Sequence, residues 1–209
     1  MSFNYCERTS FALFDEPINA ISNIAFMICG YYLIKNTKEK NSYLGYLIIF
    51  IGAGSFLFHL IPLPLFAFLD VFAIVLFIYF YNFCLCNKIL KIKKLYSNLL
   101  SFLILIASFF IGKILSESFI GSSGFYLGLI IYMFLILFFL KKQALIKHFL
   151  FSTIIFTFSL FLRSMDFYLC EYFFSVGSHF LWHMLNALVL YRLTIFLNLT
   201  NGTSPKKPT

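Results

Sequence analysis

Three of the four histidines in the chain are spaced so that they could share one metal ion. His179 and His183 are four residues apart, so on a helix they occupy one face, one turn apart. His59 belongs to a different apolar stretch and can supply a third imidazole. Catalytic zinc sites typically combine three protein ligands with an open position for water, whose pKa falls to about 7. These residues therefore predict a zinc site that activates water.

Two more polar residues accompany the histidines. Ser55 stands one helical turn before His59, and Asp70 lies five residues into the next apolar stretch. Asp70 could carry a proton from the water to a leaving amine, or it could only orient a ligand histidine. Ser55 could bond the water or a developing oxyanion, or a carbonyl of its own helix. Gly52 and Gly54 predict that another helix packs closely here.

The elements that must position these residues are predicted to be membrane-spanning helices. The 209 residues are 61% hydrophobic and 11% charged, with a mean hydropathy of +0.91, whereas soluble domains are about 45–50% apolar and about 25% charged. A helix needs about 20 residues to cross the hydrocarbon core. Seven stretches qualify, at 17–35, 43–61, 65–86, 97–115, 123–140, 148–166 and 176–198. We predict an all-α, seven-helix transmembrane bundle in one domain, residues 1–200, followed by a disordered tail, 201–209.

The basic residues predict how the bundle is oriented, because short loops rich in Lys and Arg stay in the cytoplasm. Of the 16 Lys and Arg, only Arg8, Lys113 and Arg163 fall on the side that carries the three histidines. The N-terminus and the histidine cluster are therefore predicted to be extracytoplasmic, and the C-terminus cytoplasmic. The loops account for the net charge of +8, so no nucleic-acid partner is expected. His148, beside Lys147, is predicted to lie at a cytoplasmic helix end.

Four segments, in this order, resemble the alkaline ceramidase family, part of a superfamily of seven-span membrane hydrolases that includes the adiponectin receptors. The segments are YCERT (5–9), DEPINAISNIAF (15–26), GAGSFLFH (52–59) with Asp70 after it, and GSHFLWHMLN (177–186). The resemblance implies zinc on His59, His179 and His183, with Ser55 and Asp70 in the catalytic site. It implies hydrolysis of the ceramide amide, a lipid substrate, to a sphingoid base and a fatty acid. The compact loops favour a bacterial-type member.

The resemblance also implies an N-terminal calcium site, on Asn4, the Tyr5 carbonyl, Glu7, Thr9 and Glu16. The family typically has Asp at the position of Asn4 and Asn at the position of Thr9. A missing carboxylate weakens a site for a hard cation, because affinity follows ligand charge. The alternative is that Glu7 and Glu16 are solvated charges in front of the first helix.

Two further pairs lie near the predicted extracytoplasmic side. Cys6 and Cys170 both fall in this oxidising compartment, so a disulfide between them is predicted; the alternative is two free thiols. Arg163 and Asp166 are three residues apart near the end of the sixth stretch. They are predicted to form an ion pair, the usual state of intramembrane charges, or to contact a polar head group.

The leading hypothesis is a zinc-dependent hydrolase of a lipid amide. A related hydrolase of another N-acyl or ester lipid would use the same zinc chemistry, so the sequence does not separate the two. The third hypothesis is a non-enzymatic receptor or transporter on the same bundle. A transporter needs polar residues along a path across the membrane, and the cytoplasmic halves of the predicted spans carry few. The sequence predicts no oligomeric state.

Overall fold

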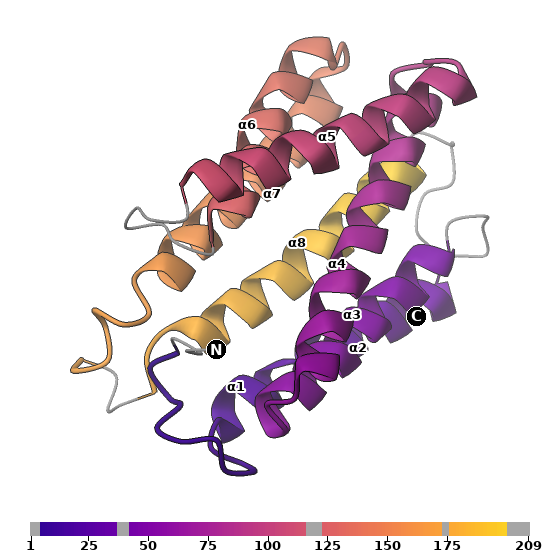
Figure 1. Ribbon diagram of the computed structural model, residues 1–209. Helices are drawn as coiled ribbons and strands as arrows, with labels where there is room; N and C mark the ends of the chain where they lie inside the picture. Colours follow the sequence, from indigo (N-terminus) through magenta and orange to yellow (C-terminus); the bar gives the residue numbers. More distant parts are fainter. Residues whose placement is uncertain (1–4, 37–41, 116–122, 173–175, 200–209) are drawn as a thin grey trace.

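The computed structural model describes residues 5–36, 42–115, 123–172 and 176–199. Asn4 and the predicted tail at 201–209 lie outside these ranges. All regular structure within them is helical (Figure 1). The elements are α1 (Pro17–Ser22), α2 (Ile24–Asn36), α3 (Ser42–Leu60), α4 (Pro64–Cys84), the π-helix η1 (Leu85–Ile89), α5 (Lys94–Ile114), α6 (Gly124–Phe139), α7 (Gln143–Ser164) and α8 (His179–Leu199).

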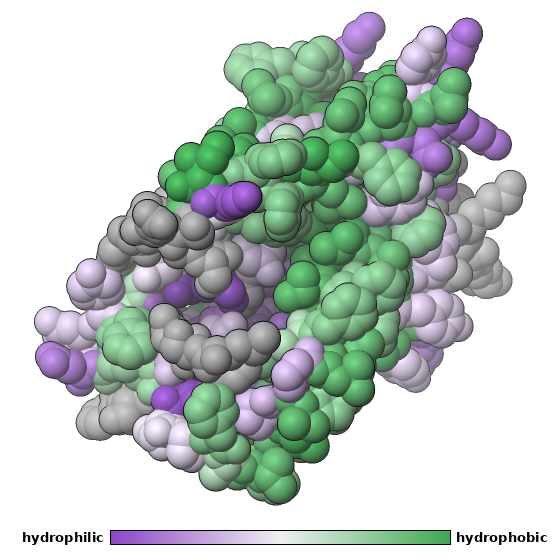
Figure 2. Space-filling view, in the orientation of Figure 1, coloured by the Kyte–Doolittle hydropathy of each residue, from purple (hydrophilic) through white to green (hydrophobic). Residues whose placement is uncertain are grey.

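The prediction of an all-α membrane bundle is confirmed. Six helical segments are long and apolar enough to cross a membrane: α1 with α2, α3, α4 with η1, α5, α7 and α8. The predicted fifth span is α6, which is apolar but has only 16 residues. The outer surface suits lipid, because hydrophobic side chains cover most of the face seen in Figure 2. Exposed aromatic residues on it include Phe109, Phe138, Phe158 and Phe161.

The largest differences from the predicted helix boundaries concern the first and sixth spans. The first span is divided, because α1 ends at Ser22 and α2 begins at Ile24. Both Ser22 and Asn23 donate side-chain hydrogen bonds to the Asn19 carbonyl, and such bonds compete with the helical ladder. The sixth span begins at Gln143 rather than at residue 148. The apolar pattern locates the hydrocarbon core, whereas the helix continues beyond it through a polar turn.

The order of the helices in space explains how the first and last helices come together. Successive long helices pack against one another, and α8 returns to lie between α7 and α2 (Figure 1). The last helix also contacts α1 and α3. Its first turns therefore lie beside α1 and the end of α3, the region that carries His59.

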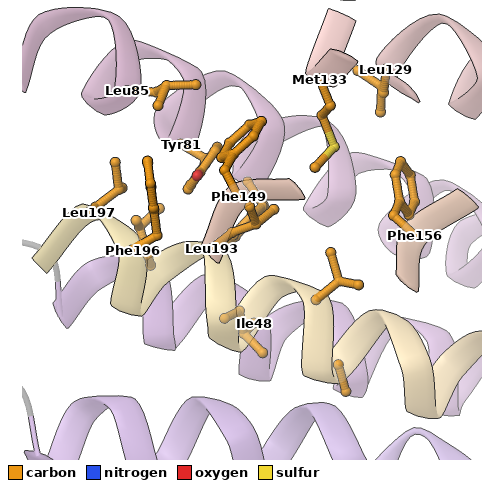
Figure 3. Close-up of a cluster of buried hydrophobic side chains, with 14 of the residues drawn as sticks. Ile48, Tyr81, Leu85, Leu129, Met133, Phe149, Phe156, Leu193, Phe196 and Leu197 are labelled. Atoms are coloured by element: carbon orange, nitrogen blue, oxygen red, sulfur yellow. The ribbon is translucent and has the colours of Figure 1, made fainter. Parts of the chain in front are cut away.

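Buried apolar side chains from α2, α3, α4, η1, α6, α7 and α8 fill the interior. Figure 3 shows Ile48 from α3, Tyr81 from α4, Met133 from α6, Phe149 from α7 and Phe196 from α8 converging on one cluster. Burial in a membrane protein gains packing rather than a hydrophobic driving force, since lipid is as apolar as the core. This cluster fixes the helices against each other and so fixes the histidines at their ends.

Candidate metal and catalytic site

The three histidines singled out in the sequence come together at one end of the bundle. His59 lies in the last turn of α3, and His179 and His183 lie in the first two turns of α8. All three are buried. Their metal-binding atoms lie within 4.8 Å of one another, and within the described residues no other group of three His, Cys, Asp or Glu side chains is placed to hold an ion. Figure 2 shows hydrophilic atoms in a hollow at this end.

The His59 imidazole is oriented by Glu16. Nδ1 of His59 lies 2.5 Å from Glu16 Oε2. Burial alone would raise the pKa of Glu16, but the His59 hydrogen bond, with help from Asn19 and the charge of Arg8, holds that pKa below its ordinary value. An ionised carboxylate only accepts hydrogen bonds, so Nδ1 of His59 must donate. The Nε2 lone pair is then left for the cluster.

The His183 imidazole is oriented by a residue of α1, and, as in His59, its Nδ1 is the hydrogen-bond donor. Its Nδ1 lies 2.8 Å from Ser22 Oγ, and the Ser22 hydroxyl donates its own proton to the Asn19 carbonyl. Ser22 therefore accepts from Nδ1 of His183, which leaves Nε2 of that ring as the atom with a lone pair. Hydrogen bonds of this kind set the tautomer of metal-ligating histidines.

Two imidazole nitrogens of the cluster are free to coordinate a metal ion. Nε2 of His59 and Nδ1 of His179 are buried and have no hydrogen-bond partner among the described residues. Buried polar atoms are rarely left without a partner, because each costs about 1–3 kcal/mol. Three imidazoles with available nitrogens and no thiolate form a donor set that zinc favours. The residues present thus fit a zinc ion.

Ser55 and Asp70 lie beside the histidines. Gly54 makes this possible, because a Cβ there would lie only 3.2 Å from the backbone of Leu69 and Asp70, so α3 and α4 touch at this point. Ser55 is buried, and its side chain lies within hydrogen-bonding reach of the Asp70 carboxylate. The carboxylate is also within electrostatic reach of His59. Gly52 likewise lies against the start of α2, as the glycine pattern predicts.

The residues implied for calcium have other partners in the structure. The Glu7 carboxylate accepts the backbone N–H groups of Ile18 and Asn19, so it caps α1. The Thr9 hydroxyl donates to Asp15 at 3.0 Å. Glu16 is buried against Arg8 and the histidine described above.

The N-terminal segment is attached to the beginning of α8. Cys6 and Cys170, the pair expected to form a disulfide, are bonded to each other. Beside them, Asp166 Oδ2 accepts the backbone N–H of Cys6 at 2.8 Å. Asp166 Oδ1 accepts the backbone N–H groups of Ser178 and His179 at 2.7 and 2.8 Å. This carboxylate therefore holds the first turn of α8 and the N-terminal segment together.

The predicted ion pair between Arg163 and Asp166 is wrong. Asp166 is occupied by three backbone N–H groups, and no ion pair joins it to Arg163. The i, i+3 rule requires a continuous helix, and α7 ends at Ser164. Arg163 instead lies over the rings of Trp182, Tyr126 and Tyr5, with its central carbon 5.2, 5.5 and 5.9 Å from the ring centroids.

Replacing Asp166 by Asn is expected to destabilise the protein. The amide can keep one oxygen for Ser178 and His179, but its NH₂ then faces the N–H of Cys6, and a buried donor without a partner costs about 1–3 kcal/mol. The measurement is the thermal unfolding midpoint in detergent. Asp15→Asn is the matched control, because Asp15 also accepts two backbone N–H groups but at an exposed site. Equal midpoints for both variants would contradict the role given to Asp166.

Two adjoining apolar cavities extend from the histidine end into the bundle. One, of about 70 Å³, is lined by residues that follow the site along the helices, among them Trp182 and Asn186. The other, of about 80 Å³, is lined deeper along α8 by Val189 and Leu193, and five residues line both. The deeper cavity shows an apolar surface, because Tyr132 donates its hydroxyl proton to the Asn82 side chain. A cavity with such walls stays dry.

Sequence reasoning missed the groups that orient the site. Glu16 was interpreted as a calcium ligand or a solvated charge, and Ser22, Tyr126 and Trp182 were not singled out. One signal was available, since Ser22 and its neighbour Asn23 are polar residues within an apolar stretch, and such residues are costly in a membrane unless they have a role. The pairing of Glu16 with a residue 43 positions away leaves no local pattern.

Comparison with known protein families gave a match over nearly the whole chain. A family model described as Ceramidase matches residues 2–208. The matched range contains every residue of the site described above. The comparison with individually curated proteins found no match.

Proposed function

Because the chain belongs to the ceramidase family, we propose that it is a zinc-dependent intramembrane hydrolase that cleaves the amide of ceramide into a sphingoid base and a fatty acid. The observation that carries the proposal is the cluster of His59, His179 and His183. Two of these histidines are held by hydrogen bonds that direct a lone pair toward the cluster, as described above.

The proposed metal ligands are His59, His179 and His183. Zinc bound there would supply a water of lowered pKa, ready to attack the amide carbon at neutral pH. Asp70 takes the proton that the attacking water loses and returns it to the nitrogen as the C–N bond breaks. Ser55, close to Asp70, holds the carboxylate in position for both transfers. The acyl carbon ends as a carboxylate and the nitrogen as an amine.

The two apolar cavities support a lipid substrate. The residues of α8 that line them run from Trp182 to Leu193, which is about 17 Å along the helix. A fully extended chain advances about 1.2 Å per bond, so this length suits an acyl chain of about 14 bonds. The chain would lie with its carbonyl at the histidines and its methyl end toward Asn82 and Tyr132. A dry apolar channel favours such an occupant over a polar one.

The proposed orientation follows the basic residues. The end of the bundle with the histidines would face the extracytoplasmic side, and the C-terminus the cytoplasm. The disulfide between Cys6 and Cys170 supports this orientation, because disulfides persist in oxidising compartments.

Calcium binding at Asn4, Tyr5, Glu7, Thr9 and Glu16 stays a prediction. The hydrogen bonds of Glu7 to α1 and of Glu16 to His59 occupy both carboxylates. The guanidinium of Arg8 is a cation bound directly to Glu16. A hard cation at this place would have to displace it.

The test is fatty-acid release from an acyl-labelled ceramide by the purified protein in detergent. We expect hydrolysis that stops when a chelator removes the metal and returns when zinc, but not calcium, is added. The matching O-acyl ester is assayed beside it, because the alternative is a hydrolase of another N-acyl or ester lipid. A zinc-loaded protein that cleaves the ester and leaves ceramide intact would refute the ceramide assignment and establish that alternative.

A further inference from the structure

One charged group beside the site has no role in the reaction as described so far. Arg163 lies in the last turn of α7, and its guanidinium is enclosed by aromatic rings from three other parts of the chain. These are Trp182 of α8, Tyr126 of α6 and Tyr5 of the N-terminal segment. The Tyr5 hydroxyl lies within hydrogen-bonding reach of the guanidinium.

Within the described residues Arg163 forms no ion pair, although the charge of Asp70 acts on it from a greater distance. Its Nε is buried without a hydrogen-bond partner there. A guanidinium has five N–H donors that point outward in its plane. Aromatic rings attract the charge of the guanidinium, whereas the donors along its edges need oxygen acceptors, of which Tyr5 supplies one. A buried cation is costly unless an opposite charge or acceptor compensates it, so the edges of Arg163 are suited to an anionic ligand.

Arg163 lies close to the groups that would take part in the reaction. Asp70, His179 and His183 all lie within electrostatic reach of its charge. The Tyr5 ring contacts both sides, with its centroid 4.1 Å from that of His179 and 5.9 Å from the central carbon of Arg163. Asp70 and Arg163 each keep part of their surface accessible although they lie among packed helices. The guanidinium thus borders the space in which the amide would react.

Amide hydrolysis in that space would produce an anion at the acyl carbon. Water adds its oxygen to this carbon, the C–N bond breaks, and the nitrogen leaves with a proton. The carbonyl oxygen carries negative charge as the water adds, and the product keeps two oxygens as a carboxylate. The planar fork of a guanidinium matches a carboxylate with two parallel hydrogen bonds.

We propose that Arg163 is a further catalytic residue, which binds the oxyanion that develops at the acyl carbon and then the carboxylate of the fatty-acid product. The inference rests on the proposed function, since it takes its ligand from amide hydrolysis. Carboxylate could also come from the head group of an N-acyl amino acid, which offers the same chemistry. The two sources are separated by the choice of ligand.

The first experiment measures palmitate binding to the chelator-treated protein in detergent, so that no metal contributes to carboxylate binding. Arg163→Met is expected to weaken palmitate binding about tenfold or more, the value of a charge-assisted hydrogen bond. Arg163→Lys keeps the charge without the planar fork, so its palmitate affinity is expected to lie between those of the wild type and Arg163→Met. Hexadecanol, which has the same chain without the carboxylate, is expected to bind the wild type and Arg163→Met equally.

Arg192→Met is the matched control variant. Arg192 also stacks on an aromatic ring, 4.4 Å from the Phe151 centroid, but it lies further along α8, away from the histidines. Its replacement is expected to leave palmitate binding unchanged. Unchanged palmitate binding in Arg163→Met would overturn the proposal, and so would an equal loss of hexadecanol binding, which would indicate a merely structural role.

A second arm tests the source of the carboxylate and the chemistry. N-palmitoylglycine binding that depends on Arg163, with palmitate binding that does not, would assign the carboxylate to a substrate head group and overturn the product assignment. With ceramide, Arg163→Met is expected to lower kcat about a hundredfold at unchanged zinc content, the usual cost of losing an oxyanion donor. Failure of the wild type to hydrolyse ceramide refutes the proposed function, whereas loss of palmitate affinity in Arg163→Met is read independently of turnover.

Discussion

Replacing His179 by Ala is expected to abolish zinc binding and to lower ceramide hydrolysis about a thousandfold or more. The site offers three imidazoles within 4.8 Å of one another, so the variant keeps only two ligands. Without the metal, the attacking water loses the shift of its pKa from 15.7 to about 7, which is what makes hydroxide available at neutral pH. His179 is the best choice of the three, because within the described part of the chain its Nδ1 makes no hydrogen bond that the change would break.

The measurements are zinc content by elemental analysis and fatty-acid release from labelled ceramide. His148→Ala is the matched control, since His148 is exposed on the second turn of α7 and outside the cluster. It is expected to keep both zinc and activity. A His179→Ala protein that folds, loses zinc and still hydrolyses ceramide at the wild-type rate would show that the metal takes no part in the reaction.

Replacing Glu16 by Gln is expected to weaken zinc binding and to destabilise the protein at the same time. The carboxylate accepts hydrogen bonds from His59, Arg8 and Asn19. A glutamine has one acceptor oxygen, and its NH₂ must face either His59 or Arg8, both of which are donors. Loss of a carboxylate behind a ligand histidine typically costs about 10–100-fold in metal affinity. A buried cation left without its partner costs about 3–5 kcal/mol.

Glu7→Gln is the control that separates this role from calcium binding. Glu7 belongs to the same predicted calcium set, but it bonds only the backbone N–H groups at the start of α1. In calcium-free buffer, we expect zinc affinity to fall in Glu16→Gln and to stay unchanged in Glu7→Gln. If instead both variants bind zinc like the wild type and both lose calcium, Glu16 acts as a calcium ligand and its support of His59 is unimportant.

The histidine cluster could be predicted because it follows from local rules. A spacing of four residues places His179 and His183 on one face of any helix. The length of the apolar stretches then sets the depth of each helix end, and this brings His59 to the same level. The structure confirms the all-α membrane bundle and places these three side chains together. Neither rule depends on how the helices are packed.

The contacts around the cluster could not be predicted, because they depend on tertiary packing and on where helices stop. Asp166 was expected to pair with Arg163, but α7 ends before it and the carboxylate turns to the backbone of α8. Arg163 is then surrounded by rings whose proximity depends on how α6, α7 and α8 pack. Glu16 reaches His59 only because the N-terminal segment folds back over the end of α3.

The positions of the site residues along the chain also determine when the site can form during biosynthesis. His59 and the residues that support it are made early, whereas His179 and His183 belong to the last helix. The disulfide and Asp166 join the first residues of the chain to the region just before that helix. The proposed metal site therefore has only one of its three histidines until the final helix has been made. A chain interrupted before α8 would lack His179, His183 and the α8 residues that line both cavities, so under the proposed function it would not hydrolyse lipid.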